Sequence, residues 1–447
     1  MEYFLKEETN KILLVNGARQ IGKSYLIRYV GKKLFKHFVE INLKEDKEGG
    51  QTFSMVYTTE DLYMRLSNYY SRPLGDKTDT LIFLDEIQSY PHMMTMLKFL
   101  NQEGRYRFIA SGSQLGVALS QTPSVPIGSV AIEQMHPLDF EEFLWGTGMG
   151  KDWIAHMREC FNKLESLSVS EHNLMLKHFQ YYLLVGGMPE AINKYLEDRN
   201  MVNVRAVQRD IHDLYRIDAS QYDSEHKLKI RSIYDLIPSN LENKKKRVIY
   251  KNIENKKGKH FSDYADEFEY LSNSGVALEV TAIGNPRFPL VESEQKRLIK
   301  LYLNDVGLLT QLLYGLNVNA ILQDIRSINL GTVYESVVAQ EFCAHGFRLH
   351  YFDNKQKGEV DFLIDDYEHL QVLPIEIKSG KDYKTHSALT NLLGTQEYGI
   401  SRAIVFSNER NVYQEDGVIY MPIYYCMFLQ RDLYGNDAVI LPELESL

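Results

Sequence analysis

The sequence has few cysteines, no long apolar run and no excess of positive charge, and each of these shortages excludes a class of protein. Its three cysteines, Cys160, Cys343 and Cys426, form no CxxC pair, which argues against a disulfide scaffold or a structural zinc site and favours a reducing compartment. The apolar-leaning segment Val418 to Leu429 is shorter than the roughly 20 residues that a membrane-spanning helix needs. Because the amino terminus also lacks the pattern of an export signal, we expect a cytoplasmic protein.

Positive charge is in short supply as well: 50 lysines and arginines stand against 60 acidic residues, for a formal net charge of −10. This balance argues against a protein that coats nucleic acid or membrane with its whole surface, so any site for a polyanion must be local. What is present is an ordinary globular composition, with 44% hydrophobic and 25% charged residues. A length of 447 residues is too great for one core and predicts several domains.

A glycine-bracketed motif near the amino end predicts a phosphate-binding loop. The apolar run KILLVN leads into GARQIGKS, which matches GxxxxGK[ST], and a helical pattern follows. In such a loop backbone N–H groups surround phosphate oxygens, Lys23 reaches the outer phosphates and Ser24 is a ligand of Mg²⁺. We expect a nucleoside triphosphate to be bound by Gly17, Ala18, Arg19, Gln20, Ile21, Gly22, Lys23, Ser24 and Tyr25.

Two further strand ends supply the polar groups that phosphoryl transfer requires. The run LIFLDE ends in Asp85 and Glu86, which strand alternation points to different places. We expect Asp85 to bind Mg²⁺ and Glu86 to orient or deprotonate the attacking water. The run RFIASGS ends in Ser113, whose hydroxyl we expect near the γ-phosphate or the water; a hydroxyl-rich turn is the alternative.

These motifs resemble a known family: bacterial and archaeal AAA-type ATPases fused to a carboxy-terminal domain of uncharacterised function with a restriction-endonuclease-like core. The resemblance extends over nearly the whole chain and rests on GARQIGKS, LIFLDEIQ, ASGS, HPLDFEEFL, LLVGGMPEAI, KLYLNDVGLL, GTVYESVVAQEF and GEVDFLI followed by PIEIKSGK. It implies ATP and Mg²⁺ as cofactors. It also implies that Gly187-Met188-Pro189, in a helical lid, lies near the adenine, with Pro189 in contact; a simple helix break is the alternative.

The sequence departs from this family at one position. Relatives usually have Gly-Arg ahead of the PLxFxEF segment, whereas this chain has Gly128 and Ser129. An arginine finger is worth roughly 10³ to 10⁵ in rate, so its absence implies slow hydrolysis. Arg19, inside the phosphate loop, is a candidate substitute, and an ordinary surface arginine is the alternative.

Carboxylates and one lysine gather at strand ends near the carboxyl end. Alternation places Glu376 and Lys378 on one face of a strand, with Asp361 on the neighbouring strand and Glu335 on the preceding helix. Oxygen ligands for Mg²⁺ beside an ammonium suit metal-assisted phosphodiester hydrolysis. The set resembles the PD-(D/E)xK nuclease signature, and both an active nuclease and a non-cleaving domain that keeps the fold remain open.

A basic segment runs from Leu241 to His260, with eight basic and two acidic residues. Such a local excess of positive charge is typical of a site for a phosphate backbone, although a solvated helix face is the alternative. The expected nucleic-acid contacts are Lys244, Lys245, Lys246, Arg247 and Lys251.

The order of elements predicts an α/β protein: a P-loop NTPase sheet of the AAA type (1–150), a helical lid (151–223), a winged helix-turn-helix (224–290) and a restriction-endonuclease-like α/β domain (291–447). We expect an Mg²⁺-dependent ATPase whose nucleotide state controls the last two domains. The alternatives are an ATP-bound regulatory or DNA-binding switch with little turnover and an ATP-gated, metal-dependent nuclease. DNA, through residues 241–260, and a second copy of the chain are the candidate partners, and no membrane contact is expected.

Overall fold

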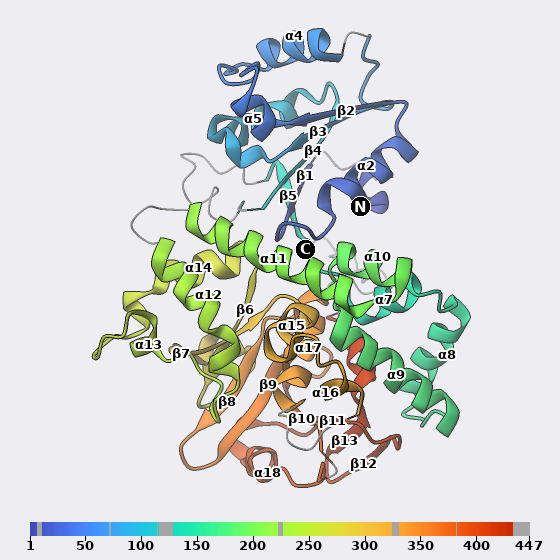
Figure 1. The fold of residues 1–447 in the computed structure, drawn as a ribbon, viewed down its shortest axis with the longest axis vertical. Coiled ribbons are helices and arrows are strands. Elements are labelled where there is room, and N and C mark those ends of the chain that lie inside the picture. Colours follow the sequence, from blue (N-terminus) through green and yellow to red (C-terminus); the bar gives the residue numbers. More distant parts are fainter. Residues whose placement is uncertain are drawn as a thin grey trace, which may run out of the picture.

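The computed structural model describes residues 1–6, 11–70, 73–113, 115, 128–221, 227–323, 330–380 and 382–431. Two β-sheets organise them, one in the amino-terminal part and one in the carboxy-terminal part, with helices between (Figure 1). The long helix α11 (Met201–Gln221) crosses the molecule between these two sheets. Helix α11 therefore lies where the amino-terminal part meets the carboxy-terminal part.

The first sheet has five strands in the order β2-β3-β4-β1-β5, and all its neighbouring strands are parallel. The strands are β1 (Ile12–Asn16), β2 (His37–Asn42), β3 (Thr80–Asp85), β4 (Arg107–Gly112) and β5 (Val130–Gln134). β1 and β3 are buried at every position, as central strands are when both faces of a parallel sheet are covered. The predicted parallel α/β sheet is thus confirmed.

Helices cover both faces of this sheet. Alternate residues of β1 enter two different apolar clusters, one with α1 and α2 and the other with α4 and α5. The covering elements are α1 (Glu2–Lys6), α2 (Lys23–Leu34), α3 (Leu43–Glu48), α4 (Thr59–Tyr70), the 3₁₀ turn η1 (Ile87–Ser89) and α5 (Pro91–Glu103). These helices pack on the faces of the sheet. The loop after β1, at the carboxyl ends of the strands, instead contacts α11.

A helical region connects the two sheets. Side-chain capping boxes begin two of its helices: Asp139 accepts a hydrogen bond from the Glu142 N–H, and Ser168 accepts one from the Glu171 N–H. Besides α11, the helices are α7 (Phe140–Gly146), α8 (Lys151–Asn162), α9 (Val169–Val185), α10 (Pro189–Asp198), α12 (Lys227–Leu241), α13 (Tyr250–Glu254), η2 (Phe261–Asp263) and α14 (Ala265–Asn273). Among the helices of the described residues, none is both long and apolar enough to cross a membrane.

The second sheet has eight strands in the order β12-β13-β11-β10-β9-β8-β6-β7. Its strands are β6 (Ala277–Ile283), β7 (Glu294–Leu303), β8 (His350–Asn354), β9 (Gly358–Asp366), β10 (Gln371–Lys378), β11 (Ala403–Ser407), β12 (Tyr413–Glu415) and β13 (Val418–Pro422). The accompanying helices are η3 (Leu290–Ser293), α15 (Val306–Tyr314), α16 (Asn319–Leu322), α17 (Leu330–Ala344), α18 (Ser387–Leu393), η4 (Gln396–Tyr398) and η5 (Ile423–Phe428). Helix α17 is buried along most of its length, which makes it the central helix of this part.

The boundary expected at residue 290 falls inside this sheet. Strand β6 pairs with β7 in antiparallel orientation and with β8 in parallel orientation. A winged helix that ends at residue 290 would need the antiparallel partner of β6 before that residue, but the partner is β7, which begins at Glu294. A strand hydrogen-bonded on both edges cannot close a separate domain, so the region expected as a winged helix-turn-helix is continuous with the carboxy-terminal sheet.

Candidate functional site

The loop after β1 has the backbone that a phosphate cradle requires. Gly17 and Gly22 both have positive φ, 145° and 93°, and Gly22 is the residue before α2 begins. A Cβ atom added to Gly17 would lie 2.3 Å from the backbone oxygen of Met135, so no side chain fits there. The glycines are thus required by close backbone approach, and the loop ends with the N–H groups at the start of α2 directed along the helix axis.

Lys23 reaches back across this loop. Its ammonium donates hydrogen bonds to the Gly17 carbonyl at 2.9 Å and the Ala18 carbonyl at 2.7 Å. Burial lowers the pKa of Lys23 to about 8, even though Glu86 and Asp85 favour its charged form. Burial thus outweighs these two carboxylates, and a phosphate group bound in the loop would favour the charged ammonium further.

Ser24 and Asp85 meet at the mouth of the loop. The Ser24 hydroxyl donates a hydrogen bond to Asp85 Oδ2 at 2.7 Å, and the Ser111 hydroxyl contacts Asp85 Oδ1. A hydroxyl and a carboxylate in contact at the phosphate loop are oxygen donors of the type that Mg²⁺ prefers, so these two residues fit the expected metal. The contact of Ser111 with Asp85 was not predicted from the sequence. The parallel pairing of Leu84 on β3 with Ala110 on β4 brings these two residues, which come next on each strand, side by side.

Glu86 stands at the end of β3, with its backbone in the left-handed region at φ 52°. Its carboxylate accepts a hydrogen bond from Gln88 Nε2 at 2.5 Å, and its N–H donates to Asp85 Oδ1 at 3.0 Å. Non-glycine residues rarely adopt this conformation, and they tend to do so where surrounding structure holds a side chain in a required position. The turn separates the Glu86 carboxylate from that of Asp85, as their expected different roles require.

Arg19 and Ser113 lie on the side of the loop that faces α11. Arg19 Nε is 2.9 Å from Asp218 Oδ2 and 3.4 Å from the Ser113 hydroxyl. The Tyr215 hydroxyl donates a hydrogen bond to the backbone oxygen of Arg19 at 3.0 Å. Arg19 is therefore not an ordinary surface arginine: it links the phosphate loop to α11, and Ser113 packs against that link.

Ser129, where relatives have arginine, lies at the start of β5. Its backbone oxygen accepts a hydrogen bond from the N–H of Ile12, the first residue of β1. The phosphate loop follows the other end of β1, about 13 Å away at a rise of roughly 3.3 Å per residue. Within one chain, Ser129 therefore lies at the amino ends of the strands, whereas the phosphate loop lies at their carboxyl ends.

A cleft of about 1010 Å³ joins the phosphate loop to the helical region. It is lined by Lys23, Ser24 and Glu86 on one side and by Pro189 on the other, and the largely exposed Tyr25 also contributes to its wall. A cleft of this size is large enough for a nucleotide. Pro189 is the first residue of α10, and its side chain stands close enough to Gly22 to touch a Cβ atom there, at 3.6 Å.

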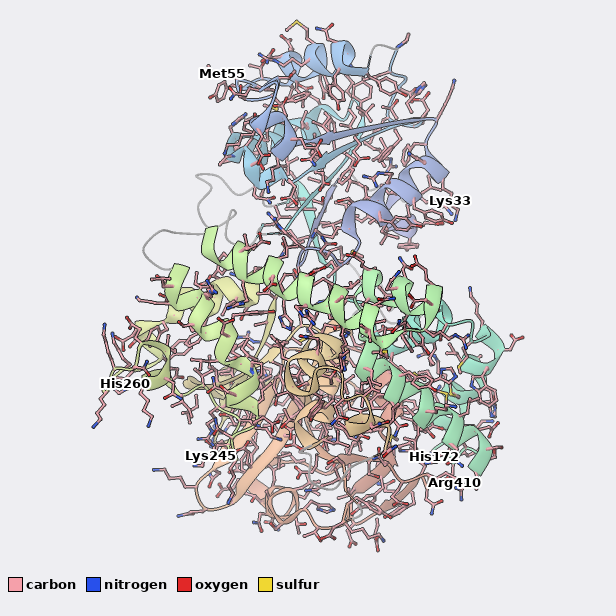
Figure 2. All side chains as sticks on the ribbon, in the orientation of Figure 1. Lys33, Met55, His172, Lys245, His260 and Arg410 are labelled. Atoms are coloured by element: carbon pink, nitrogen blue, oxygen red, sulfur yellow. The ribbon has the colours of Figure 1, made fainter. Side chains whose placement is uncertain are left out.

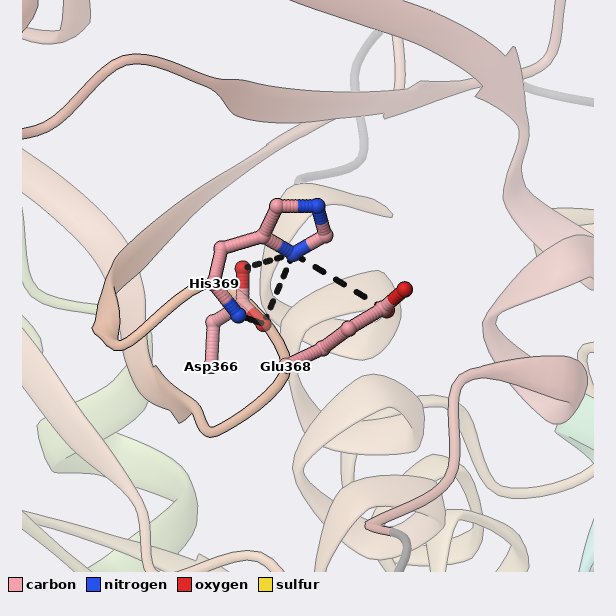
Figure 3. A group of neighbouring side chains, drawn as sticks. All are labelled: Asp366, Glu368 and His369. Carbon is pink, nitrogen blue, oxygen red and sulfur yellow. Dashed lines mark hydrogen bonds and ion pairs between the residues drawn. The ribbon is translucent and has the colours of Figure 1, made fainter.

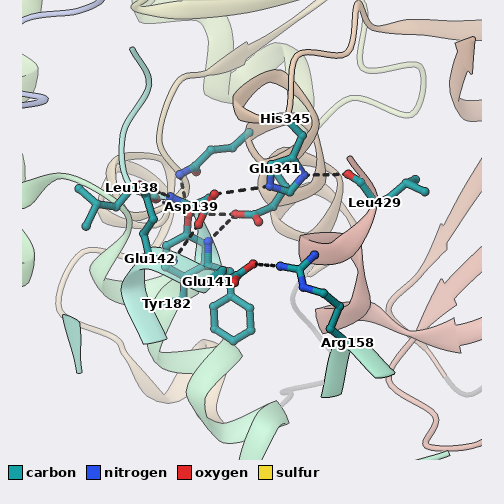
Figure 4. A network of polar contacts seen from close by, with 11 residues as sticks. Leu138, Asp139, Glu141, Glu142, Arg158, Tyr182, Glu341, His345 and Leu429 are labelled. Carbon is teal, nitrogen blue, oxygen red and sulfur yellow. Dashed lines mark hydrogen bonds and ion pairs between the residues drawn. The ribbon is translucent and has the colours of Figure 1, made fainter. Parts of the chain in front are cut away.

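Beneath the cleft a buried polar network ties the segment before α7 to α17 (Figure 4). Glu341 Oε1 accepts hydrogen bonds from the Phe140 N–H at 2.9 Å and the Tyr182 hydroxyl at 3.1 Å. His345 Nε2 lies 3.5 Å from an oxygen of Asp139, which is itself part of the cleft wall. Burial raises the pKa of Glu341 to about 8, so this carboxyl group is mostly protonated at neutral pH. The network is a second connection between the cleft and the carboxy-terminal sheet.

The four residues of the expected nuclease-like site lie near one another, Asp361 on β9, Glu376 and Lys378 on β10, and Glu335 on α17. Lys378 Nζ is 2.8 Å from Glu376 Oε1, and Asp361 Oδ2 accepts a hydrogen bond from the Ile377 N–H at 2.8 Å. Burial raises the pKa of Asp361 well above its usual range, and the nearby carboxylates of Glu335 and Glu376 add to this effect. The convergence of these residues agrees with the sequence pattern, but it does not by itself indicate cleavage.

The basic segment is divided between inward and outward side chains. Lys246 contacts Glu335, and Arg247 lies 2.6 Å from Asp353 Oδ1. These two side chains therefore bind carboxylates of the chain itself, and their contact with nucleic acid stays a prediction. Lys244, Lys245 and Lys251 are exposed, and Figure 2 shows Lys245 at the periphery of the molecule.

One other group of potential metal ligands occurs among the described residues: Asp366, Glu368 and His369, in the turn after β9 (Figure 3). His369 Nδ1 is 3.2 Å from Asp366 Oδ2, but the same oxygen is 2.8 Å from Arg402. The Glu368 side chain is 83% exposed. An exposed turn whose buried carboxylate already has a guanidinium partner has no features of a built cation site.

Three family models match the chain. An AAA domain matches residues 9–144, a domain of unknown function (DUF8612) matches residues 176–320, and another domain of unknown function (DUF4143) matches residues 330–426. The chain therefore contains a AAA-type P-loop domain followed by two domains of unknown function. The second match runs across residues 223 and 290, where the sequence predicted boundaries.

No curated protein matches the chain. Among solved structures, the Hsp104–ADP complex of S. cerevisiae is similar at 12% sequence identity, with a TM-score of 0.28. The match covers 61% of this chain and 36% of that chain, so this chain spans about a third of its length.

Proposed function

We propose that this protein binds ATP together with Mg²⁺ and hydrolyses the ATP, and that its nucleotide state is transmitted to the two domains of unknown function. One observation carries the first part: Ser24 and Asp85 are in contact at the mouth of a loop whose Lys23 ammonium donates hydrogen bonds to two backbone carbonyls of the loop itself. A loop, an ammonium and a hydroxyl–carboxylate pair facing one cleft suit a triphosphate with its metal.

The side chains divide the work of hydrolysis among them. The N–H groups of the loop and of the first turn of α2 would hold the phosphates, and the Lys23 ammonium would exchange its carbonyl partners for phosphate oxygens. Ser24 and Asp85 would hold Mg²⁺, which when bound neutralises phosphate charge. The Glu86 carboxylate, displaced from Asp85 by its turn, would orient a water molecule and take its proton.

Replacing Lys23 by alanine tests ATP binding. A hydrogen bond to a charged group contributes about 1.5 to 3 kcal/mol, so we expect the affinity for Mg-ATP to fall about 10- to 150-fold. Calorimetric titration with Mg-ATP measures this directly. Lys32→Ala, an exposed lysine on the same helix, is the matched control and should bind like the unchanged protein.

Equal affinity in Lys23→Ala and Lys32→Ala would contradict the proposed site. Phosphate release, measured with and without DNA, then separates an ATPase from an ATP-bound switch. Release above the Lys23→Ala background under either condition supports hydrolysis, and binding without any such release supports the switch.

Contacts between the phosphate loop and α11 support the second part of the proposal. The loop is held to α11 through the Arg19–Asp218 ion pair and the hydrogen bond from Tyr215 to the Arg19 carbonyl. Tyr215 in turn accepts a hydrogen bond from Asn304 Nδ2, at 3.3 Å, at the end of β7. Since Arg19 is a loop residue, a phosphate arriving in the loop competes with Asp218 for its guanidinium.

Replacing Asp218 by asparagine should uncouple α11 from the nucleotide. A half-buried ion pair is worth about 1 kcal/mol, so we expect the ATP-dependent change in hydrogen exchange of α11 to shrink about fivefold. ATP affinity itself should stay within about threefold, because Lys23 and the loop N–H groups remain. Asp213→Asn, an exposed position on the same helix, is the control. Unchanged exchange behaviour in Asp218→Asn would remove this ion pair from the transmission route.

A further inference from the structure

A dense cluster of charged side chains fills the space between α17, β9, β10 and residues 242–249. We call it the charged cluster. Its acidic members are Asp353, Glu335, Glu359, Asp361 and Glu376, and its basic members are Lys246, Arg247, Lys300 and Lys378. Acidic and basic groups are thus nearly balanced inside the protein before any ligand is added.

Lys246, like Arg247, enters the cluster from residues 242–249, outside the second sheet. Its ammonium contacts Glu335 Oε1, while Glu335 Oε2 accepts a hydrogen bond from the Tyr302 hydroxyl at 3.2 Å. Both oxygens of Glu335 are therefore engaged by groups of the chain itself. Lys246 has φ 50°, a left-handed conformation that is unfavourable for a residue with a Cβ atom. Its side chain is only 15% exposed, so the ammonium stays in the cluster despite this cost.

The other carboxylates each have a basic or backbone partner, although the buried Glu376 Oε2 has no hydrogen-bond partner among the described residues. Glu376 Oε1 pairs with Lys378 at 2.8 Å, and Glu359 Oε1 pairs with Lys300 at 2.7 Å. Asp361 Oδ2 accepts a hydrogen bond from the Ile377 N–H at 2.8 Å. Lys300 is fully buried, so its charge cannot be screened by water.

While Lys246 is seated, these donors do not fit a divalent cation. Oxygen ligands lie about 2.0 to 2.1 Å from Mg²⁺, so two of them cannot be more than about 4.2 Å apart. Glu335, Asp361 and Glu376 do not form a group in which one ligand oxygen from each lies within 4.8 Å of the others. An entering ion would also meet the ammonium groups already present, and repulsion between like charges is strong where water is excluded.

We propose that Lys246 takes the place of a divalent cation in the charged cluster. The ammonium is tethered to residues 242–249, and its contact with Glu335 excludes metal while it clamps these residues to α17, the helix that packs on the second sheet. The cluster thus works as a metal-free connection between α12 and the carboxy-terminal sheet. While Lys246 is seated, this sheet does not carry out metal-dependent phosphodiester cleavage.

Binding of Mn²⁺ in the absence of nucleotide tests this proposal, since the phosphate loop holds its metal only together with a triphosphate. Lys246→Gly removes the ammonium and also suits the positive φ at this position. We expect no Mn²⁺ site tighter than about 1 mM in the unchanged protein and one site at least about tenfold tighter in Lys246→Gly, by electron paramagnetic resonance of free Mn²⁺. That site should disappear in the double variant Lys246→Gly/Asp361→Asn, and the exposed Lys245→Gly should gain none.

Two results would overturn the proposal: Mn²⁺ bound by the unchanged protein and lost in Asp361→Asn, or no gain of binding in folded Lys246→Gly. Acetylation of the unchanged chain, read by mass spectrometry, decides the matter even if the glycine variant does not fold. Lys246 should react at least about tenfold more slowly than Lys245, because its ammonium is buried against Glu335, and Mn²⁺ should not change this ratio. A rise in Lys246 reactivity with Mn²⁺ would mean that metal displaces the ammonium.

Discussion

Replacing Glu86 by glutamine should slow ATP hydrolysis by about 10²- to 10⁴-fold and leave ATP affinity within about threefold of the unchanged protein. Glutamine keeps the size of the side chain and its contact with Gln88, but it cannot take a proton from water. The loop, Lys23 and the Ser24–Asp85 pair are untouched, so the nucleotide should still bind. The effect should therefore appear in kcat and hardly in KM.

Phosphate release under saturating Mg-ATP measures this difference, and titration with Mg-ATP measures binding. Glu190→Gln is a suitable control, because Glu190 lines the same cleft from α10, at the other wall. Turnover in that variant should stay within about threefold of the unchanged protein. Equal turnover in Glu86→Gln would remove Glu86 from the chemistry and direct attention to Ser113 or to a group from another chain.

Replacing Asp305 by alanine should lower the free energy of unfolding by about 2 to 4 kcal/mol. Asp305 is fully buried at the start of α15, where Oδ1 accepts a hydrogen bond from the Leu308 N–H at 2.9 Å. Its Oδ2 accepts one from the Gly187 N–H, at 2.5 Å, in the turn before α10. Alanine leaves both N–H groups buried without these acceptors and removes the connection between α15 and the turn before α10.

Urea unfolding followed by tryptophan fluorescence measures this loss, because both tryptophans, Trp145 and Trp153, lie in α7 and α8 of the helical region. Ser168→Ala removes a helix cap that is exposed to solvent and should cost only about 0.5 to 1 kcal/mol. An equal cost for both substitutions would mean that the N–H groups of Gly187 and Leu308 find other acceptors after Asp305 is removed.

Local sequence was sufficient where function depends on contiguous residues. The strand, the glycine-bracketed loop and the helix that begins at Lys23 follow one another within a few positions, and the structure has them in that order. The carboxylates of Glu335, Asp361 and Glu376 were also expected to converge, because strand alternation and adjacent strand ends restrict where side chains point. In these cases the spacing of residues determines the geometry.

The sequence could not reveal which distant partners the charged side chains have. The basic run around Lys246 has the composition of a nucleic-acid site, but Lys246 binds Glu335, 89 positions away. In the same way, the hairpin expected to complete a winged helix is part of the eight-stranded sheet, because β6 finds β8 as a second neighbour. The local sequence indicates where a charged side chain or a strand occurs. The partner of that side chain or strand depends on which distant segments pack against it.

By itself, the sequence determined the phosphate loop, the acidic end of β3 and the parallel character of the first sheet, since each follows from short-range spacing. Only the tertiary structure decided that Arg19 joins the loop to α11, that Ser111 contacts Asp85, and that Lys246 is directed inward. The physical reason is that a buried charge must be paired where it lies, and the partner comes from whichever element the packing brings next to it.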